Sequence, residues 1–267
     1  MGSLPHWQDE RARIRSLLAR RRVGLISDID GTISRLTATP EQARVEPRCR
    51  AALGRLARRL ALVAVVSGRS ARDACAMLAL ERVTCVGNHG LEVLADGRLQ
   101  IDAEARLYVQ RIGEVVDAVA GELNEPGILI ENKQVTASIH YRQARDPAAA
   151  RRRIRQVLAP AVRDRGLRVT EGKQVIELRP PIRRDKGTAA RRLIDDASLD
   201  GVIYLGDDTT DVAAFAAVHR WAGPNGDAAL AVAVRGRETP GEVLAAADVT
   251  AEGVEDVAEL LASMAET

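Results

Sequence analysis

The chain has 267 residues, of which 46% are hydrophobic and 28% charged, and its formal net charge is +2. The small net charge and the scattered arginines argue against a nucleic-acid-binding protein, which usually concentrates its basic residues on one face. No apolar run approaches the roughly 20 residues that a membrane span needs, so we expect a folded chain with a large core and no membrane segment.

Apolar runs that end in small polar residues predict the strands of a buried parallel sheet. These runs cover residues 23–26, 60–66, 83–86, 201–205 and 230–234. Helical patterns lie between them, over residues 47–59, 70–80, 186–196 and 211–218. Strands that alternate with helices predict an α/β fold with a Rossmann-like parallel-sheet core, in which ligands bind at the carboxyl ends of the strands.

The middle of the chain has a different pattern, a helix followed by two strands, which occurs twice. The expected helices cover residues 103–123 and 147–163, and the expected strands 128–130, 134–142, 167–170 and 174–179. The strands alternate apolar and polar residues, as in an antiparallel sheet with one open face. We therefore predict an inserted α/β domain over residues 95–183 and a main domain formed by residues 1–94 and 184–267.

Acidic residues follow two of the predicted buried strands. Asp28 and Asp30 follow the first strand, and Asp207 and Asp208 follow the strand at 201–205. Carboxylates at neighbouring strand ends can share one metal ion, and oxygen ligands suit Mg²⁺. Clustered carboxylates repel one another, and Lys186, at the start of a predicted helix, would supply part of the balancing charge.

A possible phosphate site follows the strand at 60–66. Ser67 and the amides of Gly68 and Arg69 offer neutral donors near a helix N-terminus. A nucleophilic carboxylate, a metal, a lysine and such donors are the parts that phosphoryl transfer requires, because the site must balance the charge of the transferred group. Each motif alone is commonly a turn or a capped helix start, so the prediction of chemistry depends on their occurring together.

Together, these residues resemble the four motifs of the haloacid dehalogenase superfamily. In order, they are Asp28-Ile29-Asp30-Gly31-Thr32, Ser67, Lys186, and Gly206-Asp207-Asp208-Thr209-Thr210-Asp211. The insertion between the second and third motifs resembles the large α/β cap of one subgroup. Within that subgroup the chain resembles the trehalose-6-phosphate phosphatase family, through Ser67-Gly68-Arg69, Glu131-Asn132-Lys133, His140-Tyr141-Arg142 and Asp185-Lys186-Gly187.

The resemblance implies a catalytic role for each core motif. Asp28 would be the nucleophile, and Asp30 would protonate the leaving sugar oxygen and then activate water. Mg²⁺ would bind Asp28, the backbone carbonyl of Asp30, and Asp207. Ser67 and Lys186 would hold the phosphate.

The resemblance also implies supporting and substrate-binding residues. Asp208 and Asp211 would contact the residues that bind the metal and not the metal itself. The expected substrate-binding residues are Gly68, Arg69, Asn88, His89, Glu131, Lys133, His140, Arg142, Lys173 and Glu177. The charged residues of the inserted domain could instead form salt bridges that only stabilise it, and the sequence leaves this alternative open.

The expected function is the Mg²⁺-dependent hydrolysis of trehalose 6-phosphate to trehalose and phosphate, through an aspartyl-phosphate on Asp28. Alternatives within the same fold are a phosphatase for a glucosyl- or mannosyl-3-phosphoglycerate or for sucrose phosphate, and a phosphohexomutase. An alternative of another class is a catalytically silent regulator that binds a sugar phosphate. The expected partner is a small-molecule sugar phosphate, with no nucleic acid and no membrane. A monomer is expected, although the sequence does not determine the oligomeric state.

Cysteine usage bears on the compartment. Cys49, Cys75 and Cys85 are odd in number and include no CxxC pair, which argues against a disulfide framework and a structural zinc site. Residues 1–10 contain no apolar signal core. We therefore expect reduced, buried thiols in a cytoplasmic protein.

Overall fold

A computed structural model describes residues 4–172, 174–224, 226–237 and 239–267. The chain divides into two compact units, Met1–Gln100 with Arg184–Thr267 (unit 1) and Ile101–Arg183 (unit 2). The division falls at Ile101 rather than at the expected residue 95, because strand β4 (Glu92–Ala95) and most of strand β5 (Arg98–Ile101) extend the sheet of unit 1.

Unit 1 is built on an eight-stranded sheet, in the order β12-β11-β10-β1-β2-β3-β4-β5. Six of its strands run parallel: β12 (Val249–Ala251), β11 (Ala229–Val234), β10 (Gly201–Gly206), β1 (Val23–Ser27), β2 (Leu62–Val66) and β3 (Thr84–Gly87). β4 pairs antiparallel with β3, and β5 follows at the edge. The central strands β1 and β10 are buried along their whole length, which explains their continuous apolar sequences.

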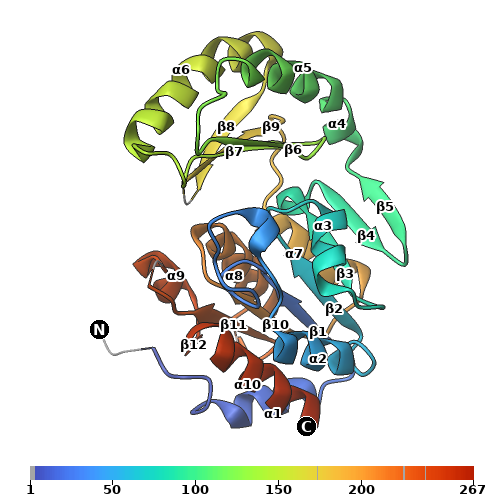
Figure 1. Cartoon of the computed structure of the whole chain (residues 1–267). Coiled ribbons are helices and arrows are strands. Elements are labelled where there is room, and N and C mark those ends of the chain that lie inside the picture. The colour runs from blue at the N-terminus through green and yellow to red at the C-terminus, as the bar shows by residue number, and fades with distance from the viewer. Residues whose placement is uncertain (1–3, 173, 225, 238) are drawn as a thin grey trace. The chain divides into compact units, whose positions relative to one another are not determined.

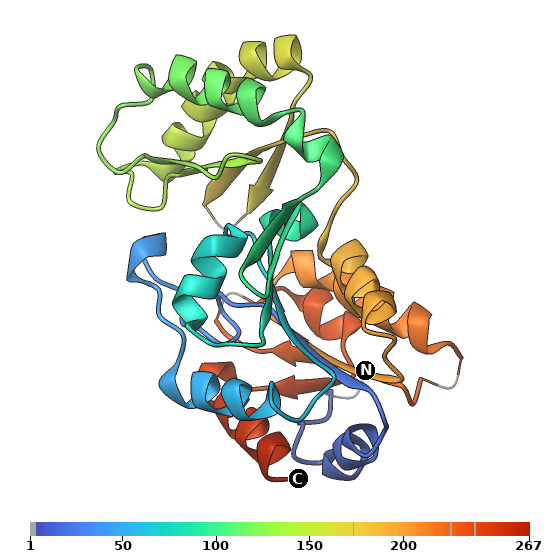
Figure 2. The same ribbon diagram turned by 90° about the vertical axis from the view of Figure 1, so that its right-hand side faces the viewer.

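Helices cover both faces of this sheet (Figures 1 and 2). Leu25 of β1 points into the core on one face, and its neighbour Ile26 points into the core on the other. The first core includes α1 (Arg11–Leu18), α2 (Pro47–Leu56), α3 (Ala71–Leu78) and α10 (Gly253–Glu266). The second includes α7 (Lys186–Asp196), α8 (Thr209–Ala222) and α9 (Gly241–Ala246). The sheet is thus buried between two helical layers.

Three helix starts in unit 1 are set by local sequence. Ser70 caps α3, as expected, by accepting a hydrogen bond from the backbone N–H of Asp73 at 3.1 Å. Asp185 caps α7 by accepting from Thr188 N at 2.7 Å, and Asp208 begins α8 in a capping box with Asp211. Each helix begins directly after a strand end or loop that carries a predicted motif, so the motifs are held at the carboxyl edge of the sheet.

Unit 2 contains a four-stranded antiparallel sheet in the order β6-β7-β9-β8. Its strands are β6 (Leu129–Asn132), β7 (Ala137–His140), β8 (Arg168–Gly172) and β9 (Val175–Arg179), and its helices α4 (Ala103–Arg106), α5 (Val109–Ala120) and α6 (Pro147–Arg165). α5 and α6 pack on the face that carries Ala137, Ile139, Ile176 and Leu178. The predicted order of helix, strand and strand, repeated twice, is confirmed, although the first helix is interrupted between Arg106 and Val109.

The predicted parallel strands and the helices between them are confirmed, with ends shifted by a few residues. Helices α1, α9 and α10 and strands β4, β5 and β12 were not predicted. β12 has only three residues, and α1 begins in a segment rich in arginine, so neither carries a strong hydrophobic pattern. In the described residues, no helix combines the length and the apolar character needed to cross a membrane.

The expectation of three reduced thiols is wrong for two of them. Cys75 of α3 and Cys85 of β3 form a disulfide, with their Cα atoms 5.8 Å apart. That spacing lies in the usual range for a disulfide, and it arises because α3 packs on the sheet beside β3. A separation of ten residues along the chain does not reveal this proximity. Cys49 is a free, buried thiol, as expected.

Candidate active site

The loop after β1 presents the first acidic residue of the site. Asp28 is 5% exposed, and its backbone N–H donates to the carbonyl of Leu205 in the adjacent strand at 2.9 Å. The chain then turns, and Gly31 adopts a φ of +93°. A Cβ at this position would lie 2.2 Å from Oδ2 of Asp207. Glycine is therefore needed both for the turn and for the close approach of the Asp207 carboxylate.

The loop after β10 presents Asp207 and, one helical turn later, Asp211. Oδ1 of Asp211 accepts hydrogen bonds from the Tyr204 hydroxyl and from Lys186 Nζ, both at 2.9 Å. Its Oδ2 accepts from the backbone N–H of Asp208 at 3.1 Å. Gly206 leaves room for this carboxylate, since a Cβ there would lie 2.3 Å from its Cγ. Asp211 is thus fixed through both oxygens.

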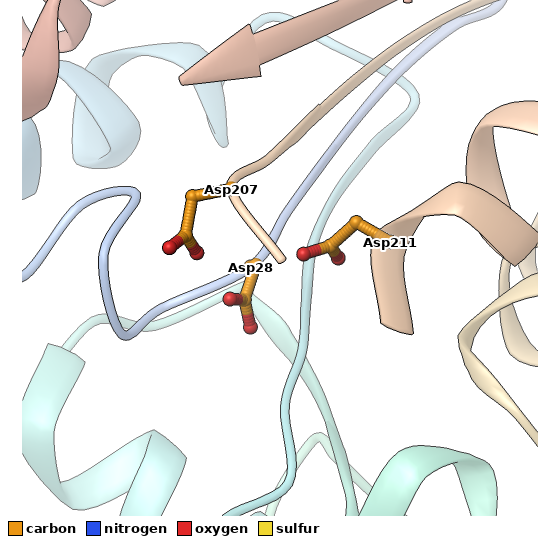
Figure 3. A group of neighbouring side chains, drawn as sticks. All are labelled: Asp28, Asp207 and Asp211. Atoms are coloured by element: carbon orange, nitrogen blue, oxygen red, sulfur yellow. The ribbon is translucent and has the colours of Figure 1, made fainter. Parts of the chain in front are cut away.

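The side chains of Asp28, Asp207 and Asp211 form a buried cluster (Figure 3). One carboxylate oxygen from each lies within 4.8 Å of the others. Asp28 follows β1, Asp207 follows β10, and Asp211 lies in the first turn of α8. Three converging carboxylates fit a hard divalent cation, which takes oxygen ligands. Asp211 already accepts three hydrogen bonds, so its two oxygens have few lone pairs left for such an ion.

Lys186 supplies one positive charge to this cluster. Its Nζ lies 2.9 Å from Oδ1 of Asp28 and 2.9 Å from Oδ1 of Asp211, and the side chain is 3% exposed. Burial lowers the pKa of Lys186, but the charges of Asp211 and Asp28 outweigh it and hold that pKa above its ordinary value. The ammonium therefore stays charged.

The cluster nevertheless has an excess of negative charge. Burial raises the pKa of Asp28 well above its ordinary value; Lys186 opposes this rise, whereas Asp211 and Asp207 add to it. The Thr32 hydroxyl lies 3.5 Å from Oδ1 of Asp207 but brings no charge. A bound divalent cation would relieve the remaining repulsion, so both the charges and the donor atoms of the described residues fit a metal ion.

Several of the predicted phosphate-binding and substrate-binding residues lie at the ends of β2 and β3. Ser67 is 2% exposed, and its hydroxyl accepts from the backbone N–H of Arg69 at 3.2 Å. The backbone N–H groups of Asn88 and His89 donate to the carbonyls of Arg69 and Ser67, at 2.8 and 2.9 Å. Gly68 lies between Ser67 and Arg69 in the loop after β2. Backbone hydrogen bonds therefore hold the loop after β2 against residues 88–89, which follow β3.

The side chain of Asp30 points to Arg69 rather than into the carboxylate cluster. Arg69 Nε lies 2.6 Å from Oδ2 of Asp30, and Nη2 lies 2.8 Å from Oδ1. The sequence predicted a role for each residue but not their contact. Asp30 belongs to the loop after β1 and Arg69 to the loop after β2, and these strands are neighbours in the sheet.

Two further residues near the site, Tyr204 and Glu92, had no predicted role. Tyr204 donates to Asp211, and a hydroxyl within a strand predicted to be buried on both faces was a signal that it needed a partner. Glu92 is 5% exposed and accepts from the backbone N–H of Ala71 at 2.5 Å, at the start of α3. Burial raises the pKa of Glu92. No feature of the sequence indicated this contact.

In unit 2, four of the predicted substrate-binding residues form one polar cluster. Lys133 Nζ lies 3.6 Å from Glu131 Oε2 and 3.9 Å from Glu177 Oε1, and His140 Nε2 lies 3.2 Å from Glu131 Oε2. Arg142 follows β7 and is half-buried. The remaining predicted residue, Lys173, lies outside the described residues. Acidic and basic groups gathered in this way can bind sugar hydroxyls, which both donate and accept hydrogen bonds.

Solved structures of other proteins show the same fold. The chain superposes on the C-terminal domain of C. albicans trehalose-6-phosphate phosphatase with a TM-score of 0.77 and 20% identity, covering 98% of each chain. A trehalose-6-phosphate phosphatase related protein gives a TM-score of 0.75 and 23% identity, covering 89% of this chain and 95% of that one. A haloacid dehalogenase-like hydrolase from Bacteroides thetaiotaomicron gives a TM-score of 0.62 and 16% identity, covering 90% of this chain and 98% of that one. The chain has the haloacid dehalogenase-like fold.

Sequence comparison defines the family. The model of the trehalose-phosphatase family matches residues 26–245. The trehalose-phosphate phosphatase of Mycobacterium avium (strain 104) is 37% identical over 212 residues, which are 75% of this chain and 52% of that protein. The trehalose-phosphate phosphatase of Mycobacterium tuberculosis (strain ATCC 25618 / H37Rv) is 36% identical over 224 residues, which are 78% of this chain and 54% of that protein. The chain therefore belongs to the trehalose-phosphatase family, and it spans about half the length of these curated relatives.

Proposed function

We propose that the protein hydrolyses trehalose 6-phosphate to trehalose and phosphate, using Mg²⁺ and an aspartyl-phosphate formed on Asp28. The observation that carries this proposal is the buried contact of Asp28 with Lys186, beside Asp207 at the end of the neighbouring strand. A carboxylate is a weak nucleophile towards a phosphate dianion unless cations balance the charge that both bring. In this proposal, unit 1 contributes the catalytic residues and unit 2 contributes the residues that bind the sugar.

In the first half of the reaction, an Asp28 carboxylate oxygen attacks phosphorus. An oxygen–phosphorus bond forms to Asp28 as the bond to the sugar oxygen breaks, and Asp30 gives its proton to that oxygen, so trehalose leaves. Lys186 holds the attacking carboxylate and balances charge on the transferred group, and Ser67 donates to a phosphoryl oxygen. Asp28, Asp207 and the backbone carbonyl of Asp30 would hold Mg²⁺, which would supply further charge neutralisation.

In the second half, a water molecule attacks the same phosphorus. Asp30, now ionised, takes a proton from the water, and the bond between phosphorus and Asp28 breaks. Phosphate leaves with Asp28 restored as a carboxylate and Asp30 restored as an acid. Hydroxyls of the sugar would be bound by the polar cluster of unit 2, through Glu131, Lys133 and Glu177.

The test is phosphate release from a panel of phosphate esters, with Mg²⁺ and with EDTA. The panel contains trehalose 6-phosphate, sucrose 6-phosphate, glucosyl-3-phosphoglycerate and glucose 6-phosphate. Strong release from trehalose 6-phosphate that EDTA abolishes is the expected result. Preference for another ester would retain the chemistry and reject the assigned sugar. If no ester is hydrolysed, interconversion of hexose phosphates would identify a mutase, and calorimetric binding without turnover would identify a regulator.

A further inference from the structure

The ion pair between Arg69 and Asp30 has a geometry that constrains the acid. Both oxygens of Asp30 are engaged, Oδ2 by Nε at 2.6 Å and Oδ1 by Nη2 at 2.8 Å. The Arg69 side chain is 15% exposed and that of Asp30 is 31% exposed. A planar guanidinium that meets a carboxylate through two parallel hydrogen bonds sets the plane and the direction of that carboxylate, which a single contact does not.

Arg69 is itself held in place along its backbone and its side chain. Its N–H donates to the Ser67 hydroxyl at 3.2 Å, and its carbonyl accepts from Asn88 N at 2.8 Å. Its third guanidinium nitrogen, Nη1, donates to the carbonyl of Pro40 at 3.2 Å. The orientation of Asp30 is thereby tied to the loop that carries Ser67, on a different strand of the sheet.

We propose that Arg69 is a positioning residue for Asp30, in addition to any contact that it makes with the substrate. The guanidinium occupies one lone pair on each carboxylate oxygen, and a carboxylate offers about four such sites. The others remain for the leaving sugar oxygen and the attacking water. Arg69 thus fixes the orientation of the Asp30 carboxylate and leaves the second lone pair of each oxygen available. This inference rests on the role of Asp30 in the proposed function.

Lysine cannot replace Arg69 in this role, because an ammonium makes a point contact and does not set the plane of its partner. Arg69→Lys therefore keeps the positive charge and removes the two parallel hydrogen bonds to Asp30. We expect it to lower kcat for trehalose 6-phosphate by about 10- to 100-fold, part of the roughly 10²–10⁴-fold that a general acid and base contributes. KM should change much less. A residue that only bound substrate would instead raise KM and leave kcat near that of the wild type.

Two further kinetic measurements separate positioning from binding. The first is the burst of p-nitrophenolate from p-nitrophenyl phosphate, a leaving group that departs without being protonated. Arg69→Lys should leave the burst rate unchanged and slow only the steady state, where Asp30 activates water. The second is a double-mutant cycle with Asp30→Asn. If Arg69 acts through Asp30, the double variant is no slower than Asp30→Asn, whereas additive losses would overturn the proposal.

Arg72→Lys is the matched control, because Arg72 lies in the first turn of α3 and is exposed. It should behave as the wild type in every assay. A direct test does not need activity: crystal structures of the ligand-free wild type and of Arg69→Gln are compared. We expect the Asp30 carboxylate to rotate away in the variant, and an unchanged orientation would reject the proposal. A wild type that hydrolyses no ester would reject the proposed function, while this structural comparison would still decide the role of Arg69.

Discussion

Lys186 Nζ lies 2.9 Å from Oδ1 of Asp28, and both side chains are almost completely buried. The pair belongs to two distant parts of the chain, since Asp28 follows β1 and Lys186 begins α7. Removing one partner of a buried ion pair leaves the other charge without compensation, which costs far more than the loss of an exposed pair. The pair therefore links the stability of unit 1 to the proposed nucleophile.

Lys186→Met should destabilise unit 1 by roughly 3–5 kcal/mol, because Asp28 and Asp211 lose their shared cation. Phosphate release should fall to background. Urea unfolding in EDTA measures the stability without a contribution from metal. Arg191→Gln is the control, because Arg191 lies on the same helix but pairs with Asp195 at the surface. Equal unfolding midpoints for the two variants would contradict this account.

Asp28→Asn should abolish turnover, because the amide keeps the shape of the side chain but is not a nucleophile, and it should retain the fold, because Lys186 keeps its ion pair with Asp211. In the wild type, rapid acid quench during turnover should trap an acyl-phosphate that hydroxylamine cleaves, and the variant should yield none. Asp195→Asn, at an exposed position of α7, should behave as the wild type. Substantial phosphate release by Asp28→Asn would exclude the covalent mechanism.

Gly31→Ala should disrupt the metal site by displacing the Asp207 carboxylate, which a Cβ would approach to 2.2 Å. Mg²⁺ affinity measured by calorimetry should fall by roughly 10- to 100-fold, as when a support of a metal ligand is lost. Gly97→Ala is a close control, because Gly97 also has a positive φ, +72°, but nothing lies within 4 Å of its Cβ position. If both variants lost affinity equally, backbone strain rather than the clash would be responsible.

Thiol titration should distinguish the three cysteines. Burial raises the pKa of Cys49 to about 12, so at pH 8 the native protein, purified without reductant, should not react with a thiol reagent. In guanidinium chloride one thiol per chain should react, and three after reduction. Three reactive thiols in the denatured, unreduced protein would show that Cys75 and Cys85 are not bonded.

Acid should destabilise unit 1 through two carboxylates. Burial alone would raise the pKa values of Asp248 and Asp256, but hydrogen bonds lower both: those from His219 and the Ala231 amide to Asp248, and those from the Glu252 amide and Trp7 to Asp256. A carboxyl whose pKa is lower in the folded state stabilises the protein above its unfolded pKa of about 3.9, and the stability is lost as pH falls below it.

Urea unfolding between pH 7 and pH 3 measures this effect. Asp248→Asn should be less stable than the wild type at pH 7 and should lose less stability on acidification. Asp9→Asn, at an exposed site, should follow the wild-type curve. An identical acid dependence in Asp248→Asn and the wild type would exclude Asp248 as a source of the effect.

The sequence by itself determined the strand ends and the motifs that follow them. Continuous apolar runs such as the one at β10 predict strands buried on both faces, and the spacing of Asp28 and Asp30 after β1 predicts an acidic edge. These features are local, because apolar periodicity, turn glycines and helix caps depend on residues only a few positions apart. The same patterns predicted the order of helices and strands in unit 2.

Only the tertiary structure decided which side chains meet. Three contacts illustrate this: the ion pair of Arg69 with Asp30, the hydrogen bond from the Tyr204 hydroxyl to Asp211, and the disulfide of Cys75 with Cys85. The proximity of these residues depends on which strands are neighbours and on how the helices pack against them. Strand order and packing are set by the burial of both sheet faces at once, a condition on the whole chain. No local pattern carries that information, so the sequence predicted the parts of the candidate site and the fold decided their contacts.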